Sequence, residues 1–567
     1  MKACSVTFVH NLFKNGAAIV KVGERKMKEK TYIGIVFATL LIASTFTALT
    51  TKAAFKGTIT IGIVGPDGLP HWDPAGMKPG AQMAADEINA AGGVQLADGN
   101  YQIVLKFADE HDYPTIDPAA AASEVERLIT VEGCEYIIGG FRTETTTTMI
   151  EKAMDYGVPM FINGAATNEL LYGLVNKSNP DKYARYKYLF RVNPTNSSTL
   201  GGTIGAGIQY LVLAKMLKLY GHQMTLPYYS PPIPPAYAPP NGLPEINCTT
   251  GVQVKVAVLV EDLAWLASTW VVFTTPTLYP RILGPNVNVT YAARIKDGTT
   301  DCTSFLQGVI DNDCRIMIHI FSGVTGDPII TQWKSMNVSA LPVGINVLGQ
   351  TQDHYSKTGG ACEYETFTIG CGTRTPLVAN VTTVFWDKFV SKTGAWPIYT
   401  AFGAYDTMYL LANGLKAIGS KDKDQLVAYL EDPAFQTESA SGLGHFKFDS
   451  IHDVFSNESS LFWKSGYVRT RMAQWQAQRI EIVTPIDAVY TKKFAIPPWM
   501  YPLKTDVNYD GTINILDISA AAKAFGATPG HPRWDIEADV NLDNIMNILD
   551  ISLIAKDFGK KITLPLD

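Results

Sequence analysis

The chain has 567 residues, of which 46% are hydrophobic and 18% charged, and its formal net charge is −6 at pH 7. This length suffices for about two to four ordinary domains, and the composition is that of a globular protein with an ample core. Because the balance is acidic and no basic run lies beyond the N-terminus, we expect no nucleic-acid partner.

The first 54 residues have the features of an export segment. Residues 21–30 are rich in lysine and arginine, and residues 31–51 contain no charged side chain. A positive flank before an apolar stretch is typical of a signal peptide or of an N-terminal membrane anchor. The stretch is about as long as a short transmembrane helix, so both interpretations stay open. Small residues at 51–54 favour cleavage.

No second apolar stretch of spanning length follows in the sequence. We therefore expect the rest of the protein to be extracytoplasmic, either secreted or on the cell surface. It would meet the membrane only through the N-terminal segment, if that segment is not cleaved. Six of the seven cysteines lie beyond the segment, and their number permits many disulfide pairings. Sequence proximity suggests two short loops and one remaining pair: Cys302/Cys314, Cys362/Cys371 and Cys134/Cys248.

Strand and helix patterns alternate in the first third of the chain. Apolar β-branched runs are separated by segments with helical spacing, and Asp117 with Pro118 forms a typical helix start. Such alternation predicts a parallel sheet with helices on both faces. The predicted order is strand 58–65, helix 80–94, strand 101–109, helix 117–130, strand 134–140, helix 145–157 and strand 158–164.

The alternation of strand and helix patterns resumes after a proline-rich stretch. Residues 226–244 include eight prolines, which predicts an exposed loop. Two such halves suggest two lobes around a hinge within residues 55–495. The second half contains predicted strands at 252–260, 315–321 and 341–349, helices from about 263, at 327–336 and at 405–419, and late strands within 461–485.

A duplicated motif follows a second proline-rich linker, which we place at 496–505. Residues 506–526 and 539–559 are identical at 14 of 21 positions. Each copy is a loop followed by a predicted helix, and position 6 is Gly511 or Asn544, the residues that best tolerate positive φ. We assign 506–567 to this C-terminal domain.

Oxygen-bearing side chains recur at loop positions 1, 3, 5, 9 and 12 of both copies, and position 7 would contribute its backbone carbonyl. Calcium takes about six to eight oxygen ligands, and this spacing curls the side chains around one point. The motif therefore predicts two calcium ions. The predicted ligands are Asp506, Asn508, Asp510, Thr512, Asn514 and Asp517 in the first copy, and Asp539, Asn541, Asp543, Ile545, Asn547 and Asp550 in the second.

The duplicated loop–helix unit, with "DVNxDG" opening the first loop and "F-G" ending each helix, resembles a dockerin domain over about 506–560. The resemblance implies a small all-α fold and a cohesin-type module on another protein as partner. In that family, loop positions 10 and 11 often set partner choice. Here they are Ile515, Leu516, Ile548 and Leu549, which are apolar where many cellulosomal dockerins carry Ser or Thr.

The larger region carries four motifs in order: "GIVGPDG", "GAQMAADEINAAGGV", "EYIIGGFRTETTTTM" and "GVPMFINGAAT". Together they resemble the branched-chain amino acid type of substrate-binding protein of ABC transporters, over about 58–490. The resemblance implies an α/β, two-lobed type I periplasmic-binding-protein fold, in which two parallel βαβ lobes joined by a hinge hold a small ligand between them.

Ten positions of this sequence are candidate ligand contacts, and the resemblance implies nine of them. A Ser/Thr after the "IGG" strand and an "AAT" segment hold the ligand's α-carboxylate and α-ammonium, and strand ends with helix N-termini suit a carboxylate. Further positions bring aromatic or polar contacts, and Gln350 stands near a family carboxylate that holds the amino group. Arg142 is a candidate for binding a ligand acid instead. The ten are Thr143, Thr145, Ala165, Thr167, Trp72, Trp265, Phe321, Ser322, Gln350 and Arg142.

The favoured hypothesis is an extracytoplasmic solute receptor of an ABC importer that closes on its ligand and delivers it to a permease. One alternative is a sensor or scaffold-displayed binding protein without transport. Another is a dockerin-borne hydrolase, which is less favoured because the catalytic-looking positions hold hydroxyls and aromatics. The sequence also lacks GxSxG, HExxH and P-loop motifs, but motifs alone do not exclude a glycosidase. We expect no enzyme activity.

Overall fold

The computed structural model describes residues 55–193, 196–208, 254–284, 286–371, 373–374, 380–454, 470–484, 492–497, 500, 504–508 and 511–561. The predicted export segment and the proline-rich stretch at 226–244 lie outside these residues. So do Cys248 and the predicted calcium ligand Asp510.

The first lobe is built on a six-stranded sheet with the order β2-β3-β1-β4-β5-β6. All neighbours pair in parallel except β2 and β3. The central strands are buried apolar runs, as expected for a sheet covered on both faces. The strands are β1 (Gly57–Gly65), β2 (Val94–Leu96), β3 (Gly99–Asp109), β4 (Tyr136–Gly139), β5 (Met160–Ile162) and β6 (Leu189–Arg191).

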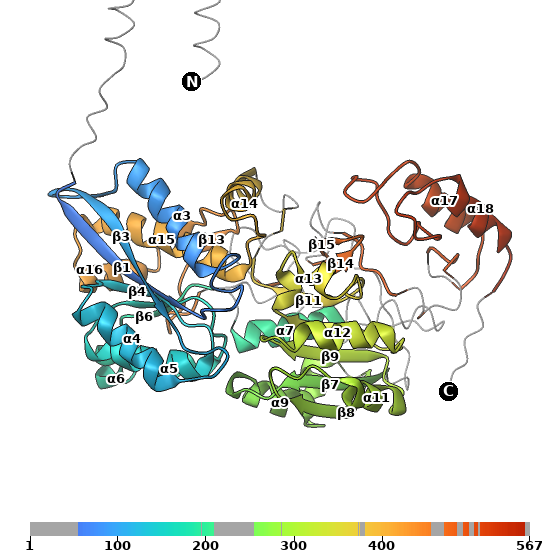
Figure 1. Ribbon diagram of the computed structural model, residues 1–567, viewed down its shortest axis with the longest axis horizontal. Coiled ribbons are helices and arrows are strands. Elements are labelled where there is room, and N and C mark those ends of the chain that lie inside the picture. Colours follow the sequence, from blue (N-terminus) through green and yellow to red (C-terminus); the bar gives the residue numbers. More distant parts are fainter. Residues whose placement is uncertain are drawn as a thin grey trace, which may run out of the picture. The chain divides into compact units, whose positions relative to one another are not determined.

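Helices cover both faces of this sheet (Figure 1). On one face α3 (Met77–Ala90) packs with α15 (Tyr399–Ile418), and on the other α4 (Pro118–Thr130) packs with α5 (Thr143–Asp155). Asp117 caps α4 by accepting from the backbone N–H groups of Ala119 and Ala120. The lobe also includes α6 (Pro180–Tyr186), α14 (Asn380–Thr393) and α16 (Lys423–Leu430), and the small sheet of β12 (Thr437–Glu438) and β13 (His445–Phe446).

The second lobe has a seven-stranded sheet with the order β15-β14-β11-β10-β9-β7-β8. The first five strands in the chain pair in parallel, and the last two are antiparallel additions. They are β7 (Val254–Glu261), β8 (Val287–Ile295), β9 (Ile316–Phe321), β10 (Leu341–Asn346), β11 (Thr366–Ile369), β14 (Arg471–Gln476) and β15 (Arg479–Ile482).

Shorter helices surround this second sheet. They are α7 (Ser197–Gly207), η4 (Ala264–Leu266), α9 (Ala267–Thr274), α10 (Tyr279–Leu283), α11 (Thr303–Asp311), α12 (Gly326–Ser335), η5 (Leu348–Gln350) and α13 (His354–Lys357). The chain changes lobe after β6, after β11 and after Val454. Helix α15 therefore belongs to the first lobe although it follows most of the second in sequence. The predicted two-lobed α/β fold is confirmed.

The C-terminal repeat forms two helices, α17 (Ile515–Lys523) and α18 (Ile548–Lys556), which pack against each other. Each follows its loop as the duplicated sequence predicts. A small core of its own joins the two copies, and an isolated antiparallel bridge links Thr512 to Lys561. The fully buried members of that core include Val507, Ile513, Ala521, Met546 and Ile554.

The five described cysteines, Cys134, Cys302, Cys314, Cys362 and Cys371, are all buried and unpaired. The two short-range disulfides suggested by sequence proximity are therefore absent. Burial raises the pKa of Cys302 to about 11, so its thiol stays protonated in the core. Within residues 55–561, no described helix has the length and apolar character needed to cross a bilayer.

A buried polar network supports the second lobe beneath the ends of its strands. Glu365 is fully buried and accepts from His354 Nε2 (2.7 Å), His319 Nε2 (3.0 Å) and Asn346 Nδ2 (2.8 Å). His354 Nδ1 lies 2.6 Å from Asp327 Oδ1. Although burial opposes it, the two carboxylates raise the pKa of His354 to about 9. His354 is thus a charged group held between two acids.

This network predicts a loss of stability at alkaline pH. The folded-state pKa of His354, about 9, lies above the reference value of 6.5. Its contribution is therefore complete below pH 6.5 and is lost as the pH rises through about 9. We expect the free energy of unfolding, measured by urea denaturation, to decline between pH 7 and pH 9.5.

His354→Ala should lower the free energy of unfolding at neutral pH by about 3–5 kcal/mol, because it leaves the buried Glu365 and the partly exposed Asp327 without their cation. It should also flatten the alkaline decline. Lys357→Ala on the same helix is the control, since Lys357 pairs with Asp353 at the surface. That change should cost less than about 1 kcal/mol. Equal losses for the two variants would contradict the assignment.

Candidate functional site

The candidate site lies where the carboxyl ends of the two parallel sheets face each other. In the first sheet β1 lies between β3 and β4, so the strands that follow it in the chain are added on opposite sides. In the second sheet β7 lies likewise between β8 and β9. Such switch points leave a crevice outside the strand ends, where ligands bind in α/β folds. The loops that follow β4, β5, β7, β9, β10 and β11 meet at this crevice.

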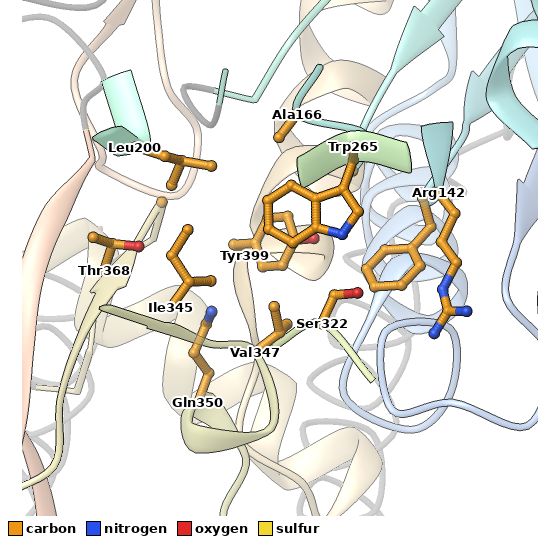
Figure 2. A pocket seen from close by; sticks show the side chains of 13 residues that line it. Arg142, Ala166, Leu200, Trp265, Ser322, Ile345, Val347, Gln350, Thr368 and Tyr399 are labelled. Atoms are coloured by element: carbon orange, nitrogen blue, oxygen red, sulfur yellow. The ribbon is translucent and has the colours of Figure 1, made fainter. Parts of the chain in front are cut away.

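A cavity of about 520 Å³, part of it open to solvent, occupies the crevice. Its walls come from both lobes and are mostly apolar or aromatic (Figure 2). The apolar and aromatic composition of the walls suits a small organic molecule. The first lobe contributes Phe141, Arg142, Gly164, Ala166 and Tyr399, and the second contributes Leu200, Trp265, Ser322, Ile345, Val347, Gln350, Thr368 and Gly370.

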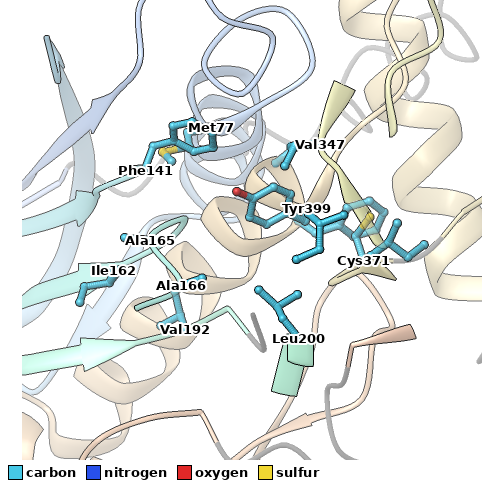
Figure 3. Packing of buried hydrophobic residues seen from close by; sticks show 14 of the residues in the cluster. Met77, Phe141, Ile162, Ala165, Ala166, Val192, Leu200, Val347, Cys371 and Tyr399 are labelled. Atoms are coloured by element: carbon cyan, nitrogen blue, oxygen red, sulfur yellow. The ribbon is translucent and has the colours of Figure 1, made fainter. Parts of the chain in front are cut away.

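The apolar part of the cavity continues the core of both lobes. Tyr399, the first residue of α15, lies among side chains from both sides, including Phe141, Leu200 and Val347 (Figure 3). Since these side chains are already packed, the cavity walls are largely preformed. A bound ligand would therefore replace solvent against an apolar surface and would not need to reorganise the core.

The loop after β5 is fixed by a buried arginine. Arg191 forms a bidentate ion pair with Asp453, with Nε–Oδ1 and Nη2–Oδ2 distances of 2.9 and 2.7 Å. Its Nη1 donates to the backbone carbonyls of Ala165 (3.2 Å) and Thr167 (2.9 Å). The guanidinium thus holds both ends of the turn that presents Ala166 to the cavity.

A buried glutamate fixes the cavity loops in each lobe. Glu110, next after β3, accepts from the backbone N–H groups of Phe141 (2.7 Å) and Arg142 (3.2 Å). Glu261, the last residue of β7, accepts from Trp265 Nε1 (2.7 Å) and from the Ser322 hydroxyl (2.5 Å). Burial raises the pKa of both carboxyls, which favours their neutral forms.

Two polar groups of the cavity wall have no hydrogen-bond partner among the described residues. They are Arg142 Nε and the Thr368 hydroxyl, and their side chains are almost completely buried. A buried polar group without a partner is costly, so such groups mark places where a ligand or water completes the bonding. Figure 2 shows Arg142 at one end of the cavity and Thr368 with Gln350 at the other.

Two polar contacts join the lobes beside the cavity, and both start from the N-terminal end of α5, whose N-cap is Arg142. Arg142 Nη2 donates to Asp297 Oδ2 over 2.6 Å, and Glu144 Oε1 accepts from the backbone N–H of Ala264 over 2.9 Å. We call these two contacts the interlobe clasp. Arg142 lines the cavity, and Ala264 directly precedes Trp265, which also lines it. The clasp therefore involves one wall residue directly and the backbone next to another.

Ionisable groups lie buried behind Arg142. Burial raises the pKa of Asp112 to about 7, although the charge of Arg142 opposes this shift. Burial and the charge of Arg142 lower the pKa of His71 to about 3, so this imidazole is neutral and packs on Phe141 at 4.2 Å between ring centroids. The region behind Arg142 therefore contains groups whose neutral forms are favoured near neutral pH.

Four of the ten predicted ligand contacts line the cavity: Arg142, Trp265, Ser322 and Gln350. Of the other six, Thr143 and Thr167 bond to each other through their hydroxyls at 2.5 Å, and Thr145 donates to Glu110. Ala165 is buried between Gly164 and Ala166, which line the cavity instead, and Trp72 and Phe321 pack in the lobe cores. Ligand contact by any of the ten remains a prediction.

Several lining residues were not predicted from the sequence. Val347 and Gly370 directly follow strands, a position that could have indicated them. Ile345, Thr368, Leu200 and Tyr399 lie inside elements, where nothing in the local pattern distinguishes a cavity wall from a core position.

The first C-terminal loop folds around buried carboxylates. Asp506 is 1% exposed and Oδ2 accepts from the backbone N–H of Gly511 at 2.9 Å. Asp517 is fully buried and accepts from the backbone N–H groups of Asn508 (3.1 Å) and Asn514 (2.8 Å). Gly511 has a φ of +81°, which turns the loop back toward its start.

The second loop repeats this arrangement. Asp539 and Asp550 are again almost fully buried, and Asp539 accepts from the backbone N–H groups of Asp543 (3.2 Å) and Asn544 (2.9 Å). Asn544 has a φ of +64°, as expected for a glycine substitute. Two near-buried carboxylates in each loop, with amide and carbonyl oxygens at the intervening positions, suit a hard cation. Among the described side chains, no group of three or more His, Cys, Asp or Glu forms a metal cluster.

Apolar side chains are exposed at the start of both C-terminal helices. Ile515 and Leu516 are 60% and 58% exposed, and their counterparts Ile548 and Leu549 are 60% and 57% exposed. Isolated exposed apolar residues are common, but matched pairs in two copies indicate a contact surface.

Comparison with known proteins gives two family matches. Residues 58–216 match the family model described as periplasmic binding protein, and residues 504–559 match the dockerin type I domain. A Leu/Ile/Val-binding protein homolog of Brucella abortus is 31% identical over 117 residues, which are 20% of this chain and 24% of that protein. The chain thus matches about a quarter of the length of this curated relative.

Solved structures resemble a larger part of the chain. The branched-chain amino acid transporter substrate-binding protein LivJ of Streptococcus pneumoniae, solved with isoleucine, has a TM-score of 0.54 and 20% identity, covering 75% of this chain and 99% of that one. A solute-binding protein of an R. palustris ABC transporter, solved with benzoate, has a TM-score of 0.52 and 15% identity, covering 75% and 96%. The chain therefore combines a periplasmic-binding-type two-lobed fold with a dockerin type I domain.

The Arg191 anchor leads to a test of the cavity geometry. Arg191→Lys keeps the charge but cannot reproduce the bidentate pair with Asp453 together with the bonds to the 165–167 turn. We expect the free energy of unfolding to fall by about 2–5 kcal/mol, since a buried pair is broken. Arg185→Lys is the control, because Arg185 pairs with Glu151 and Asp155 at the surface. Urea denaturation of both variants measures the difference, and similar midpoints would contradict the anchor role.

Proposed function

We propose that the protein is the extracytoplasmic solute receptor of an ABC importer, which binds one small carboxylate-bearing or amino-acid-like ligand between its two lobes. The observation that carries this proposal is the preformed cavity at the facing strand ends, lined by both lobes and containing unpartnered buried polar groups. Ligand bound there would contact both lobes and stabilise their closed arrangement.

The chemistry of the cavity favours binding over catalysis. Its polar lining groups are a guanidinium, a serine hydroxyl bonded to Glu261, an amide, a threonine hydroxyl and a tyrosine. The Ser322 hydroxyl is bonded to the carboxyl of Glu261, but burial raises the pKa of that carboxyl and so favours its neutral form, which cannot act as a general base. The fold relatives solved with isoleucine and benzoate support a small carboxylate as ligand.

We further propose that the dockerin domain attaches the receptor to a cohesin-type module and folds around two calcium ions. In the first loop Asp506, Asn508, Asp510, Asn514 and Asp517 would hold the ion with the Thr512 carbonyl. In the second, Asp539, Asn541, Asp543, Asn547 and Asp550 would do so with the Ile545 carbonyl. The buried carboxylates of Asp506, Asp517, Asp539 and Asp550 support this assignment, because hard oxygen ligands at matched loop positions suit calcium, whose binding would be coupled to folding.

The proposed organisation has an export signal or anchor at 1–54, the ligand-binding domain at 55–495, a linker at 496–505 and the dockerin at 506–567.

A second candidate function, a scaffold-displayed sensor without transport, uses the same cavity and the same dockerin. The two differ in whether a permease recognises the closed lobes. Reconstitution of ligand uptake with a candidate permease in vesicles would distinguish them.

The ligand proposal predicts stabilisation by a small carboxylate. A thermal-shift screen of the full chain with carboxylic acids, amino acids and amides should find at least one ligand that raises the unfolding temperature. A ligand present at about 100 times its Kd adds about 2.7 kcal/mol. Ala166→Leu should fill the cavity and abolish this shift, because Ala166 is part of the wall.

Ala119→Leu is the matched control for the Ala166 variant, since position 119 lies in the first turn of α4, outside the cavity. It should leave the ligand-induced shift intact. The proposal would be overturned by a screen in which no small molecule produces a shift that Ala166→Leu removes.

Calcium removal gives a separate prediction. EDTA should unfold the dockerin, seen as a loss of helical circular dichroism and of protease resistance in 504–559, and calcium should restore both. The ligand-induced thermal shift of the two lobes should persist in EDTA.

Asp506→Ala with Asp539→Ala should remove calcium binding in a calorimetric titration, while the exposed-site control Asp387→Ala should not. An unchanged calcium titration in the double variant would refute the loop assignment.

A further inference from the structure

The cavity has a cationic lining residue and no anionic one. Among its described lining residues Arg142 is the only charged side chain. It is 4% exposed, and its Nε has no hydrogen-bond partner among the described residues. A charged, nearly buried donor of this kind is the strongest determinant of ligand charge that a small cavity can contain.

The guanidinium has donors to spare. Arginine offers five N–H groups in a planar fork, and the structure shows Nη2 bonded to Asp297. The pairing with Asp297 fixes the orientation of the fork without using Nε. A ligand carboxylate can therefore bind Arg142 while the interlobe clasp stays closed, which would link recognition of the charge to the closed arrangement of the lobes.

The nearby carboxylates are not available to a ligand ammonium group. Both oxygens of Glu261 already accept protein donors, from Trp265 and Ser322 on Oε1 and from the Gly323 backbone on Oε2. Asp297 is bonded to Arg142 and to the Gly298 backbone. Asp112, behind Arg142, has two carboxyl oxygens without a hydrogen-bond partner among the described residues, but it is not among the described lining residues. An ammonium group in the cavity would therefore lose its water, meet no carboxylate in the described wall and lie close to a cation, which is strongly unfavourable.

The rest of the wall suits an apolar body with one further acceptor or donor. Leu200, Ile345, Val347 and Trp265 cover the apolar surface, and the unpartnered Thr368 hydroxyl lies at the end away from Arg142 (Figure 2). The lining of the cavity is thus charged at the Arg142 end, apolar along the walls and polar but uncharged at the Thr368 end.

We propose that the cavity selects small monocarboxylates that have an apolar body and no protonated amine, and that Arg142 sets this specificity. The inference rests on the proposed receptor function and narrows its ligand class. Arg142 binds the carboxylate through Nε, the apolar walls enclose the carbon skeleton, and amino acids of the same skeleton are disfavoured by their ammonium group.

A matched ligand series tests the selection. Binding of 4-methylpentanoate, L-leucine, 4-methylpentanamide and 3-methylbutylamine to the full chain is measured by calorimetry in calcium-containing buffer, with benzoate as an aromatic acid. These ligands separate the carboxylate, the ammonium and the apolar body. We expect 4-methylpentanoate or benzoate to bind at least tenfold more tightly than L-leucine and the amide, and the amine not to bind.

Equal or tighter binding of L-leucine would overturn the inference while leaving the receptor function intact. Failure of every member of the series would also overturn it. The receptor function would then be judged by the wider thermal-shift screen and its Ala166→Leu variant, so the two failures can be told apart.

Variants test the role of Arg142. Arg142→Gln should reduce the acid-to-amide affinity ratio at least tenfold, whereas Arg185→Gln, which changes a surface arginine outside the cavity, should preserve the ratio. A ratio unchanged by Arg142→Gln would refute the specificity role. If that variant fails to fold, Arg142→Lys replaces it. Its acid-to-amide affinity ratio should lie between the wild-type ratio and equal affinity for the two ligands, since a lysine keeps the charge without the fork.

Discussion

A buried glutamate at a strand end is the constraint around which each half of the cleft is organised. Glu110 follows β3 and Glu261 ends β7, and both are fully buried. A carboxyl in that position must find hydrogen-bond donors, because leaving it unsatisfied costs more than most single contacts contribute. The donors it finds belong to the loops after the neighbouring strands, so satisfying the carboxyl fixes those loops.

The same constraint explains why the cavity wall is charged where it is. Glu110 holds the backbone of Phe141 and Arg142 at the start of α5, which directs the next turn toward the second lobe. Glu261 accepts hydrogen bonds from Trp265 and Ser322. The residue before Trp265 is Ala264, whose backbone N–H donates to Glu144 in the first lobe. Each lobe therefore positions one side of the interlobe clasp through its own buried acid. The clasp is the point where two independently organised lobes become coupled.

Much of this architecture could be predicted from the sequence, and the parts that could not have physical reasons. Long apolar strands such as β1 and β7, and the capped helix α4, have strong local signals and were predicted within a few residues. Strand β8 was missed because it is only half-buried, so its residues Val287–Ile295 alternate weakly. The sequence also could not show that α15 belongs to the first lobe, since that depends on where the chain crosses between the sheets.

The candidate site divides in the same way. Trp265, Ser322 and Gln350 could be named because the family resemblance placed contact positions on them, and Arg142 because it stands beside the hydroxyl run. Thr145 could not be separated from them, because its neighbour in space is Glu110, which lies 35 residues away in sequence. Local pattern identifies loops at strand ends, but it does not decide which hydroxyl turns toward the cavity and which satisfies a buried acid.

The C-terminal repeat shows the opposite case, in which nearly everything is local. Each loop contains its own buried aspartates, its own donors and its own positive-φ turn, so fixed offsets in the sequence determine the geometry. Asn544 replaces Gly511 without loss of the turn, because asparagine is among the few residues that accept this backbone conformation. What the repeat leaves free is its surface, and there the two copies agree as well: Ile515–Leu516 and Ile548–Leu549 are exposed to nearly the same degree. The agreement between the copies at these exposed positions fits the proposed attachment to a partner module. Long-range contacts therefore shape the cavity between the lobes, whereas local repetition shapes the two C-terminal loops.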